Sequence, residues 1–181
     1  MKNEKKAKYA YYLLNKPNDV ISTHDDPKNR KNLNIFLDQI KEEVFAVGRL
    51  DRKTTGLMLL TNDGDLANQL LHPRYQISKI YEVELDKKIS HEDMNKCKKG
   101  FFLEDGPIKF ETIEVIAKTK LIISLHEGRN KIIRRTFAYL NYDVKKLKRT
   151  QIGSLTLDQL KTGQIRPCTT KEIKELKSHL K

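Results

Sequence analysis

The pattern of apolar and polar positions predicts a chain of short strands interrupted irregularly by helices. Leu57–Thr61 is a continuous apolar run, which is typical of a buried strand. Tyr81, Val83 and Leu85 alternate with charged residues, as expected for a half-buried strand. Further strands are predicted at 9–14, 44–47, 108–116, 121–125 and 144–152. This arrangement favours an α+β fold with a largely antiparallel mixed central sheet over a regular alternation of strands and helices.

Helical spacing and capping residues place the helices between these strands. Leu33, Phe36 and Ile40 recur at helical spacing behind Asn32, a residue typical of a helix N-cap. Further helices are predicted at 65–71, from Ser90 to Gly100, at 130–140, and from Thr169 to the C-terminal end. Residues 15–18 are predicted to form a turn and residues 25–32 a loop.

Length and composition limit the class of protein. A chain of 181 residues with 38% hydrophobic content predicts a single domain over 1–181, with room for two sub-lobes that share one sheet. No apolar run approaches the roughly 20 residues that a bilayer requires. Two cysteines cannot build a disulfide scaffold, and the basic start at 2–6 is not followed by a signal-peptide core. We therefore expect a cytoplasmic, monomeric protein that does not bind a membrane.

The positive charge is concentrated in the last third of the chain. The formal net charge is +12, and residues 118–181 contain 16 Lys and Arg against 5 Asp and Glu. The densest basic part comprises Lys131, Arg134, Arg135, Lys145, Lys146, Lys148 and Arg149. Clustered positive charge is typical of a surface that binds phosphates, so a nucleic-acid partner is favoured over a generally basic surface.

The segment 48–57, Gly-Arg-Leu-Asp-Arg-Lys-Thr-Thr-Gly-Leu, is a polar loop between two apolar strands. Loops held on a rigid frame often carry functional groups. Asp51 stands between Arg49 and Arg52, whose charges favour its ionised form. An ionised, fixed carboxylate can act as a nucleophile or stabilise a cationic transition state. The alternative is an aspartate that only ties down its loop.

Other catalytic arrangements find less support. A glycosidase needs two facing carboxylates, and Asp63 and Asp65 lie in a turn and at a helix start, where acids are common. The five histidines, which include His24, are scattered without metal-ligand spacing, and no phosphate-binding glycine motif occurs. We therefore expect no metal.

A second informative segment joins a predicted strand to the helix at 130–140. It contains Arg129 and Lys131 beside the start of the helix, and Arg134 and Arg135 on opposite sides of its apolar stripe. Helical spacing does not decide which of these two arginines reaches inward. Tyr81, on the apolar face of its strand, is either a core tyrosine or a plate on which a base stacks.

Together these segments resemble the pseudouridine synthases, in the branch that contains the ribosomal RNA enzymes RsuA and RluB. The matching stretches, in chain order, are Lys16-Pro17, Gly48-Arg49-Leu50-Asp51, 55–64, 66–68, 71–73, Lys79-x-Tyr81-x-Val83, Glu127-Gly128-Arg129-Asn130, Leu147-x-Arg149-x-x-Ile152-Gly153 and Gly163-x-x-Arg166. Each motif is short, but the ordered set covers nearly the whole chain.

The resemblance implies roles for individual residues. Asp51 would be the catalytic aspartate, Tyr81 would pack against the target uracil, and Arg134 would pair with Asp51. Leu147 would line the pocket under the base, and Arg49 would help to hold the place of the flipped nucleotide. Two departures stand out, because Ile132 replaces a usual glutamine and Asn141 a usual glycine.

The resemblance also implies the pseudouridine synthase fold, with an active-site cleft across the sheet, and isomerisation of uridine to pseudouridine without a cofactor. The expected partner is ribosomal RNA or a ribosome-assembly intermediate. The N-terminal RNA-binding domain that this branch often carries is expected to be absent. The alternatives are a non-catalytic RNA-binding protein with the same fold and a glycosylase that releases a free base.

Overall fold

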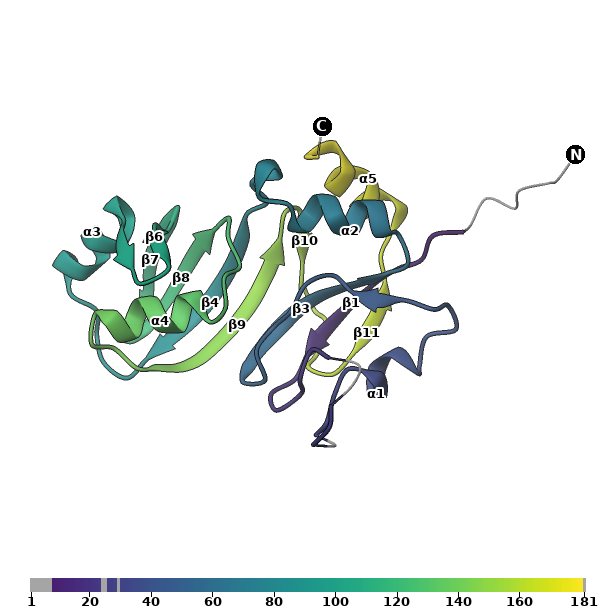
Figure 1. Cartoon of the computed structure of the whole chain (residues 1–181), viewed down its shortest axis with the longest axis horizontal. Helices are drawn as coiled ribbons and strands as arrows, with labels where there is room; N and C mark the ends of the chain where they lie inside the picture. Colours follow the sequence, from purple (N-terminus) through teal and green to yellow (C-terminus); the bar gives the residue numbers. More distant parts are fainter. Residues whose placement is uncertain (1–7, 24–25, 29, 181) are drawn as a thin grey trace, which may run out of the picture.

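A nine-stranded mixed sheet runs along the length of the molecule (Figure 1). The computed structural model describes residues 8–23, 26–28 and 30–180; the basic start, His24 and part of the predicted loop lie outside the described residues. The strands are β1 Tyr11–Lys16, β2 Phe45–Ala46, β3 Thr54–Thr61, β4 Lys79–Leu85, β5 Phe101–Leu103, β6 Gly106–Ile108, β7 Thr112–Ala117, β8 Lys120–Leu125, β9 Val144–Ile152, β10 Leu155–Thr156 and β11 Ile165–Pro167. The helices are α1 Asn34–Leu37, α2 Gly64–Leu71, the 3₁₀ turn Pro73–Tyr75, α3 His91–Lys99, α4 Ile132–Tyr139 and α5 Thr170–Ser178. The α+β class is confirmed.

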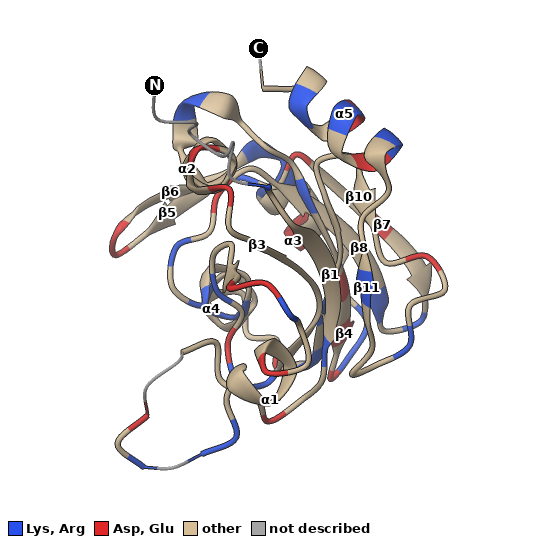
Figure 2. Cartoon of the chain, turned by 90° about the vertical axis from the view of Figure 1, so that its right-hand side faces the viewer, with Lys and Arg blue, Asp and Glu red and all other residues tan. Residues whose placement is uncertain are grey.

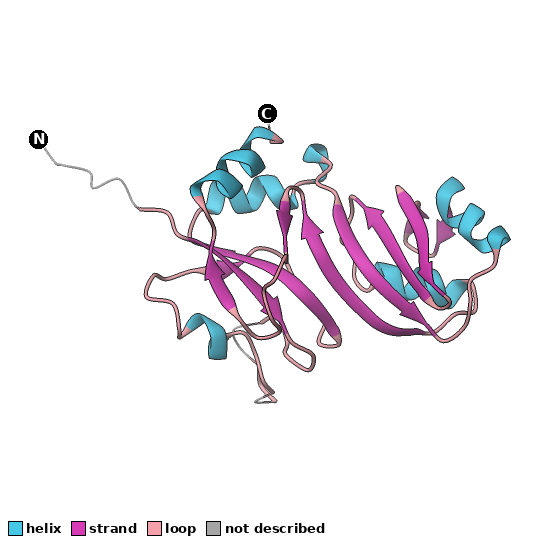
Figure 3. Ribbon diagram, turned by 180° about the vertical axis from the view of Figure 1, so that it is seen from behind, coloured by secondary structure: helices cyan, strands magenta, loops and turns pink. Residues whose placement is uncertain are grey.

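The strand order is β11-β1-β3-β9-β4-β8-β7, with β2 beside β3 and β10 beside β9. Neighbouring strands are antiparallel except β3 and β9, which run parallel through three residue pairs that start at Thr54 and Leu147. This short parallel contact, which we call the seam, joins two halves of the sheet. Seen from behind, α2 and α5 lie over one half and α3 and α4 over the other (Figure 3).

Three apolar clusters fill the space between the sheet and the helices. One is formed by the second half of the sheet with α3 and α4. The other two lie on opposite faces of β1 and β3, so that Leu57 and Leu59 pack towards α2 and α5, whereas Met58 and Leu60 pack towards α1. Burial on both faces explains why the predicted strand 57–61 is apolar throughout.

Two irregularities in the pairing of β4 with β9 decide which residues face the same way. The register shifts between Ile80 and Tyr81 and again between Glu84 and Leu85. As a result, the buried positions of β9 do not follow strict alternation; they are Val144, Leu147, Arg149 and Ile152. The first of these irregularities therefore brings Arg149 and Ile152, three residues apart, to one face of the sheet.

Several predicted boundaries differ from the structure. The first helix is confined to Asn34–Leu37, although the Asn32 side chain accepts a hydrogen bond from the Asn34 amide as a cap would. The predicted turn 15–18 is wrong in part, because β1 continues to Lys16. The predicted strand 108–116 divides into β6 and β7, since the backbone between them turns to bury Phe110. The predicted caps at Ser90 and Thr169 are confirmed.

Gly56 makes the seam possible. Its φ is +109°, and a Cβ at this position would lie 2.1 Å from the carbonyl oxygen of Arg149 on β9. Backbone on both sides cannot move without separating the strands, so the close approach requires glycine.

Gly56→Ala should lower the free energy of unfolding by at least about 2 kcal/mol, because the methyl group collides with backbone and the φ is strained. Gly64→Ala is the control, since Gly64 lies in α2 with open space around it and alanine favours a helix. Urea denaturation of the two variants checks this prediction, and equal midpoints would contradict it.

Candidate active site

A cleft of about 810 Å³ opens beside the seam and collects many of the residues predicted from the sequence. Its walls come from the loop between β2 and β3, from β4, from the loop between β8 and α4, and from β9. The predicted residues that line it are Arg49, Asp51, Tyr81, Arg129, Lys131, Leu147 and Arg149. Those that do not line it are Arg134, Arg135, Lys145, Lys146 and Lys148. Asp51 and Tyr81 therefore reach one cavity from different halves of the sheet.

The loop that carries Asp51 is held by its backbone. Each of the four successive carbonyl groups at 50–53 accepts a hydrogen bond. The donors, in order, are the Ser22 hydroxyl at 2.6 Å, the Thr54 amide at 2.9 Å, the Asp19 amide at 2.9 Å and the Arg134 guanidinium at 3.2 Å. Because three of these donors come from distant segments, the tertiary structure fixes the position of the half-buried Asp51.

Lys16 is a buried cation whose role the sequence motif did not reveal. Its side chain is fully buried, and its ammonium group donates hydrogen bonds to the carbonyls of Val20 at 2.7 Å and Pro17 at 3.1 Å. Burial lowers the pKa of Lys16 to about 8, while the carboxylates of Asp51 and Asp19 act in the opposite direction. Lys16 thus ties the segment after β1 beside the Asp51 loop and contributes positive potential to it.

Tyr81 and Leu147 form an apolar wall opposite the loop. Tyr81, on β4, is 7% exposed and pairs across the sheet with Ile123 on one side and Arg149 on the other. Leu147, on β9, is 5% exposed and lies opposite Val83. An aromatic ring beside an aliphatic side chain is a surface on which a flat base can pack.

The expected pairing of Arg134 with Asp51 is not present in the part of the chain that the structure describes. The Arg134 guanidinium instead donates to the carbonyls of Val144 at 3.1 Å and Lys53 at 3.2 Å. These bonds link α4 and the start of β9 to the Asp51 loop. The structure therefore makes Arg134 a support of the loop, because both of its terminal nitrogens are engaged by backbone oxygens.

Arg129 and Arg135, both predicted to contact RNA, are neutralised by carboxylates. Asp105, at the turn of the β5–β6 hairpin, accepts from Arg129 at 3.0 Å and from Arg135 at 2.8 and 2.9 Å. Arg129 also binds the carboxylate of Glu127. The arginines lower the pKa of Asp105 and keep it ionised. Both arginines therefore fasten the hairpin to the rim of the cleft. Among the described residues, the predicted cations that line the cleft without such a carboxylate partner are Arg49, Lys131 and Arg149.

The remaining predicted lysines point away from the cleft. Lys145 and Lys146 are exposed and form ion pairs with Asp143 at 2.8 Å and Glu84 at 3.3 Å. Lys148 follows Leu147 on β9 and so lies on the opposite face. Part of the basic excess is on α5, where blue segments are visible in Figure 2. The structure therefore does not gather the basic residues into one patch at the cleft.

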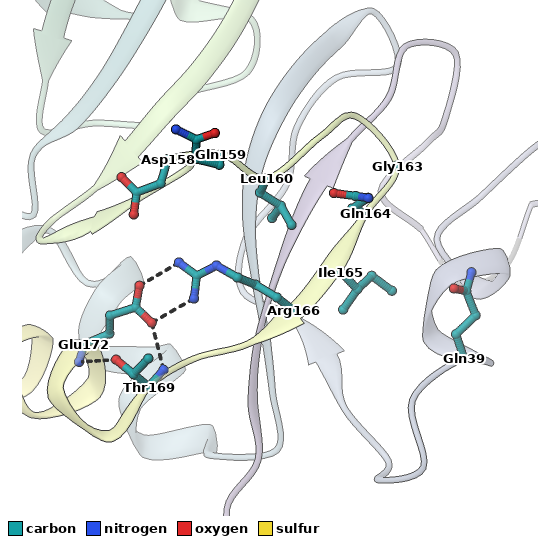
Figure 4. A pocket seen from close by; sticks show the side chains of 10 residues that line it. All are labelled: Gln39, Asp158, Gln159, Leu160, Gly163, Gln164, Ile165, Arg166, Thr169 and Glu172. Atoms are coloured by element: carbon teal, nitrogen blue, oxygen red, sulfur yellow. Dashed lines mark hydrogen bonds and ion pairs between the residues drawn. The ribbon is translucent and has the colours of Figure 1, made fainter.

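A second cavity, also of about 810 Å³, lies beside β11 and α5 (Figure 4). Arg166 and Glu172 meet there in a two-pronged ion pair with distances of 2.9 and 2.6 Å, and Glu172 also accepts from the Thr169 amide at 2.8 Å. Because these charged groups satisfy each other, Arg166 serves to fasten β11 to α5. This cavity contains none of the residues predicted for catalysis.

Two features are absent from the described residues, namely a metal-binding cluster and a membrane-spanning helix. No group of three or more His, Cys, Asp or Glu side chains there could hold a metal ion. In that same part of the chain, no helix has the length and apolar character needed to span a membrane.

Comparison with known proteins gives a consistent result. The family model for RNA pseudouridylate synthase matches residues 10–139. Ribosomal large subunit pseudouridine synthase B of Bacillus subtilis is 40% identical over 175 residues, which cover 93% of this chain and 72% of that protein. A crystal structure of a pseudouridylate synthase superposes with a TM-score of 0.86 at 32% identity, covering 93% of this chain and 74% of that one.

A more distant structure shares the fold alone. A chain from the archaeal box H/ACA sRNP Nop10-Cbf5 complex aligns with a TM-score of 0.57 at 17% identity, over 83% of this chain and 50% of that one. The family match covers more than half of the chain and agrees with the resemblance found in the sequence. The chain belongs to the RNA pseudouridylate synthase family and is an RNA-modifying isomerase.

Proposed function

We propose that this enzyme converts a specific uridine of ribosomal RNA to pseudouridine, with Asp51 as the catalytic carboxylate. The observation that carries the proposal is the position of Asp51, half-buried in a cleft whose opposite wall contains Tyr81 and Leu147. The name of the Bacillus subtilis relative, which refers to the large ribosomal subunit, supports ribosomal RNA as the substrate.

The reaction needs a site that holds a detached base beside a ribose. The bond between N1 of uracil and C1′ of ribose breaks, the base turns, and a bond forms between C5 and C1′. The proton on C5 is lost and N1 gains one, so the composition of the RNA does not change. A fixed carboxylate can act on the ribose or on the base in this sequence, while an apolar wall retains the ring.

The cleft is suited to a nucleotide that has left its helix. Removing a base from its stack costs a few kcal/mol, and stacking on an aromatic side chain recovers about 1–3 kcal/mol. Tyr81 would supply the stacking, Leu147 would lie under the ring, and Arg49 with Lys131 would contact phosphates at the mouth. A non-catalytic RNA-binding protein would not require the backbone bonds that hold the Asp51 loop.

Asp51→Asn should reduce pseudouridine formation by at least about 1,000-fold, because the amide keeps the shape but loses the charge used in the transition state. RNA affinity should stay within about threefold, since the phosphate contacts are intact. Carbodiimide labelling followed by primer extension on in vitro transcribed large-subunit ribosomal RNA measures the product. Asp65→Asn, at an exposed position of α2, is the control. Substantial turnover by the Asp51 variant would refute the assignment.

Replacing Tyr81 by Phe should change the rate less than replacing it by Leu. Phenylalanine keeps the ring that stacks on uracil, whereas leucine removes it and should cost about tenfold or more. The same assay at saturating RNA gives both rates. Equal losses for the two variants would show that stacking is not the function of Tyr81.

A further inference from the structure

Two cations at one end of the cleft have no role in the function described so far. Lys79 and Arg149 both line the cleft, and they flank Tyr81. Lys79 lies two residues before Tyr81 on β4 and shares its face, while Arg149 is the direct cross-strand partner of Tyr81 on β9. A flat ring that packs on Tyr81 is therefore within side-chain reach of both cations.

Neither cation is neutralised by a carboxylate in the described residues. Arg149 is 4% exposed; its Nε donates to the Leu57 carbonyl at 2.9 Å, and its Nη2 is buried with no hydrogen-bond partner among the described residues. The ammonium group of Lys79 donates a long hydrogen bond of 3.4 Å to the Ile77 carbonyl. Arg129, Arg135 and Arg166, by contrast, each form an ion pair with an acid.

This arrangement is unfavourable for the folded protein by itself. Burial and the nearby charge of Arg149 lower the pKa of Lys79 to about 8, with Glu127 acting in the opposite direction. Two desolvated like charges destabilise a fold unless an anion joins them. The site therefore has an unmet requirement for negative charge next to the position proposed for the base.

We propose that Lys79 and Arg149 bind the oxygens of the uracil ring and stabilise its negative charge while it is detached from the ribose. This inference rests on the proposed function. When the N1–C1′ bond breaks, its electron pair stays with the ring, whose charge is shared by N1, O2 and O4. The charge is consumed when C5 bonds to C1′, after which C5 loses its proton and N1 receives one. The two cations thus stabilise the intermediate more than the bound uridine, because the uracil ring of the substrate is neutral.

The test compares Lys79→Met with Lys148→Met, which removes a lysine from the opposite face of β9. The substrate is in vitro transcribed large-subunit ribosomal RNA, and the rate is measured in single turnovers at saturating enzyme. Lys79→Met should lower this rate by about 100-fold, as for loss of one group that stabilises developing charge, with little change in Kd. Its unfolding temperature should be unchanged or higher, because a desolvated charge has been removed. Lys148→Met should keep the wild-type rate.

The Lys79→Arg variant allows a second measurement, the pH dependence of the rate. This dependence would not change if Lys79 had only a structural role. The charged groups that face Lys79 are Arg149 on β9 and Glu127 after β8, with His126 also lining the cleft. The wild-type rate should fall as the pH rises through about 8, whereas the arginine variant should keep its rate between pH 7 and 9.

Three results would overturn the inference. A wild-type rate for Lys79→Met would show that the cation is not used. A higher Kd with an unchanged rate at saturation would make the pair a phosphate contact. A wild-type enzyme that is inactive on every RNA offered would overturn the proposed function itself. This result differs from the other two because it concerns the wild-type enzyme alone, without any variant.

Discussion

The arrangement of the cleft depends on one close contact, the approach of β3 and β9 at Gly56. The strands run parallel for only three residue pairs, and the Arg149 carbonyl occupies the space that any side chain at position 56 would need. This seam holds the start of β3, and hence Asp51, next to the strand pair that carries Tyr81 and Leu147. Asp51, which we propose as the catalytic carboxylate, and the apolar wall belong to different halves of the sheet, so the seam sets their relative position.

A second constraint acts within each half. Of the four carbonyl groups around Asp51, one accepts from the local Thr54 amide and three accept from two distant segments, the one after β1 and α4, and Lys16 is buried beside them. In the other half, the bulge opposite Ile80 and Tyr81 on the β4–β9 pair turns Arg149 and Ile152 to the same face. Backbone hydrogen bonds thus fix the loop, and bulges fix the wall, while the side chains inside the cleft remain available for substrate. The uncompensated charges of Lys79 and Arg149 are consistent with a site built to receive an anion.

Local features could be predicted from the sequence because they depend on neighbouring residues. The buried strand at 57–61, the caps at Ser90 and Thr169, and the loop position of Asp51 follow from periodicity and residue type. The parallel seam joins residues about 90 positions apart, and bulges break the alternation on which strand prediction rests. The ion pairs of Arg129 and Arg135 could not be predicted from the sequence either, since Asp105 lies 24 residues from Arg129 and 30 from Arg135. The basic cluster therefore looked like one phosphate-binding surface, although much of it is neutralised or on the other face.

We propose that the seam brings Asp51 and Tyr81 to the two sides of one extruded uridine. The most direct measurement is a crystal structure of the Asp51→Asn variant bound to a uridine-containing ribosomal RNA fragment that the wild-type enzyme modifies. We expect the target base to lie against the Tyr81 ring, with C1′ of its ribose beside position 51 and a carbonyl oxygen of the base towards Lys79 or Arg149. RNA bound on the Lys145 and Lys146 face, with the cleft empty, would contradict it.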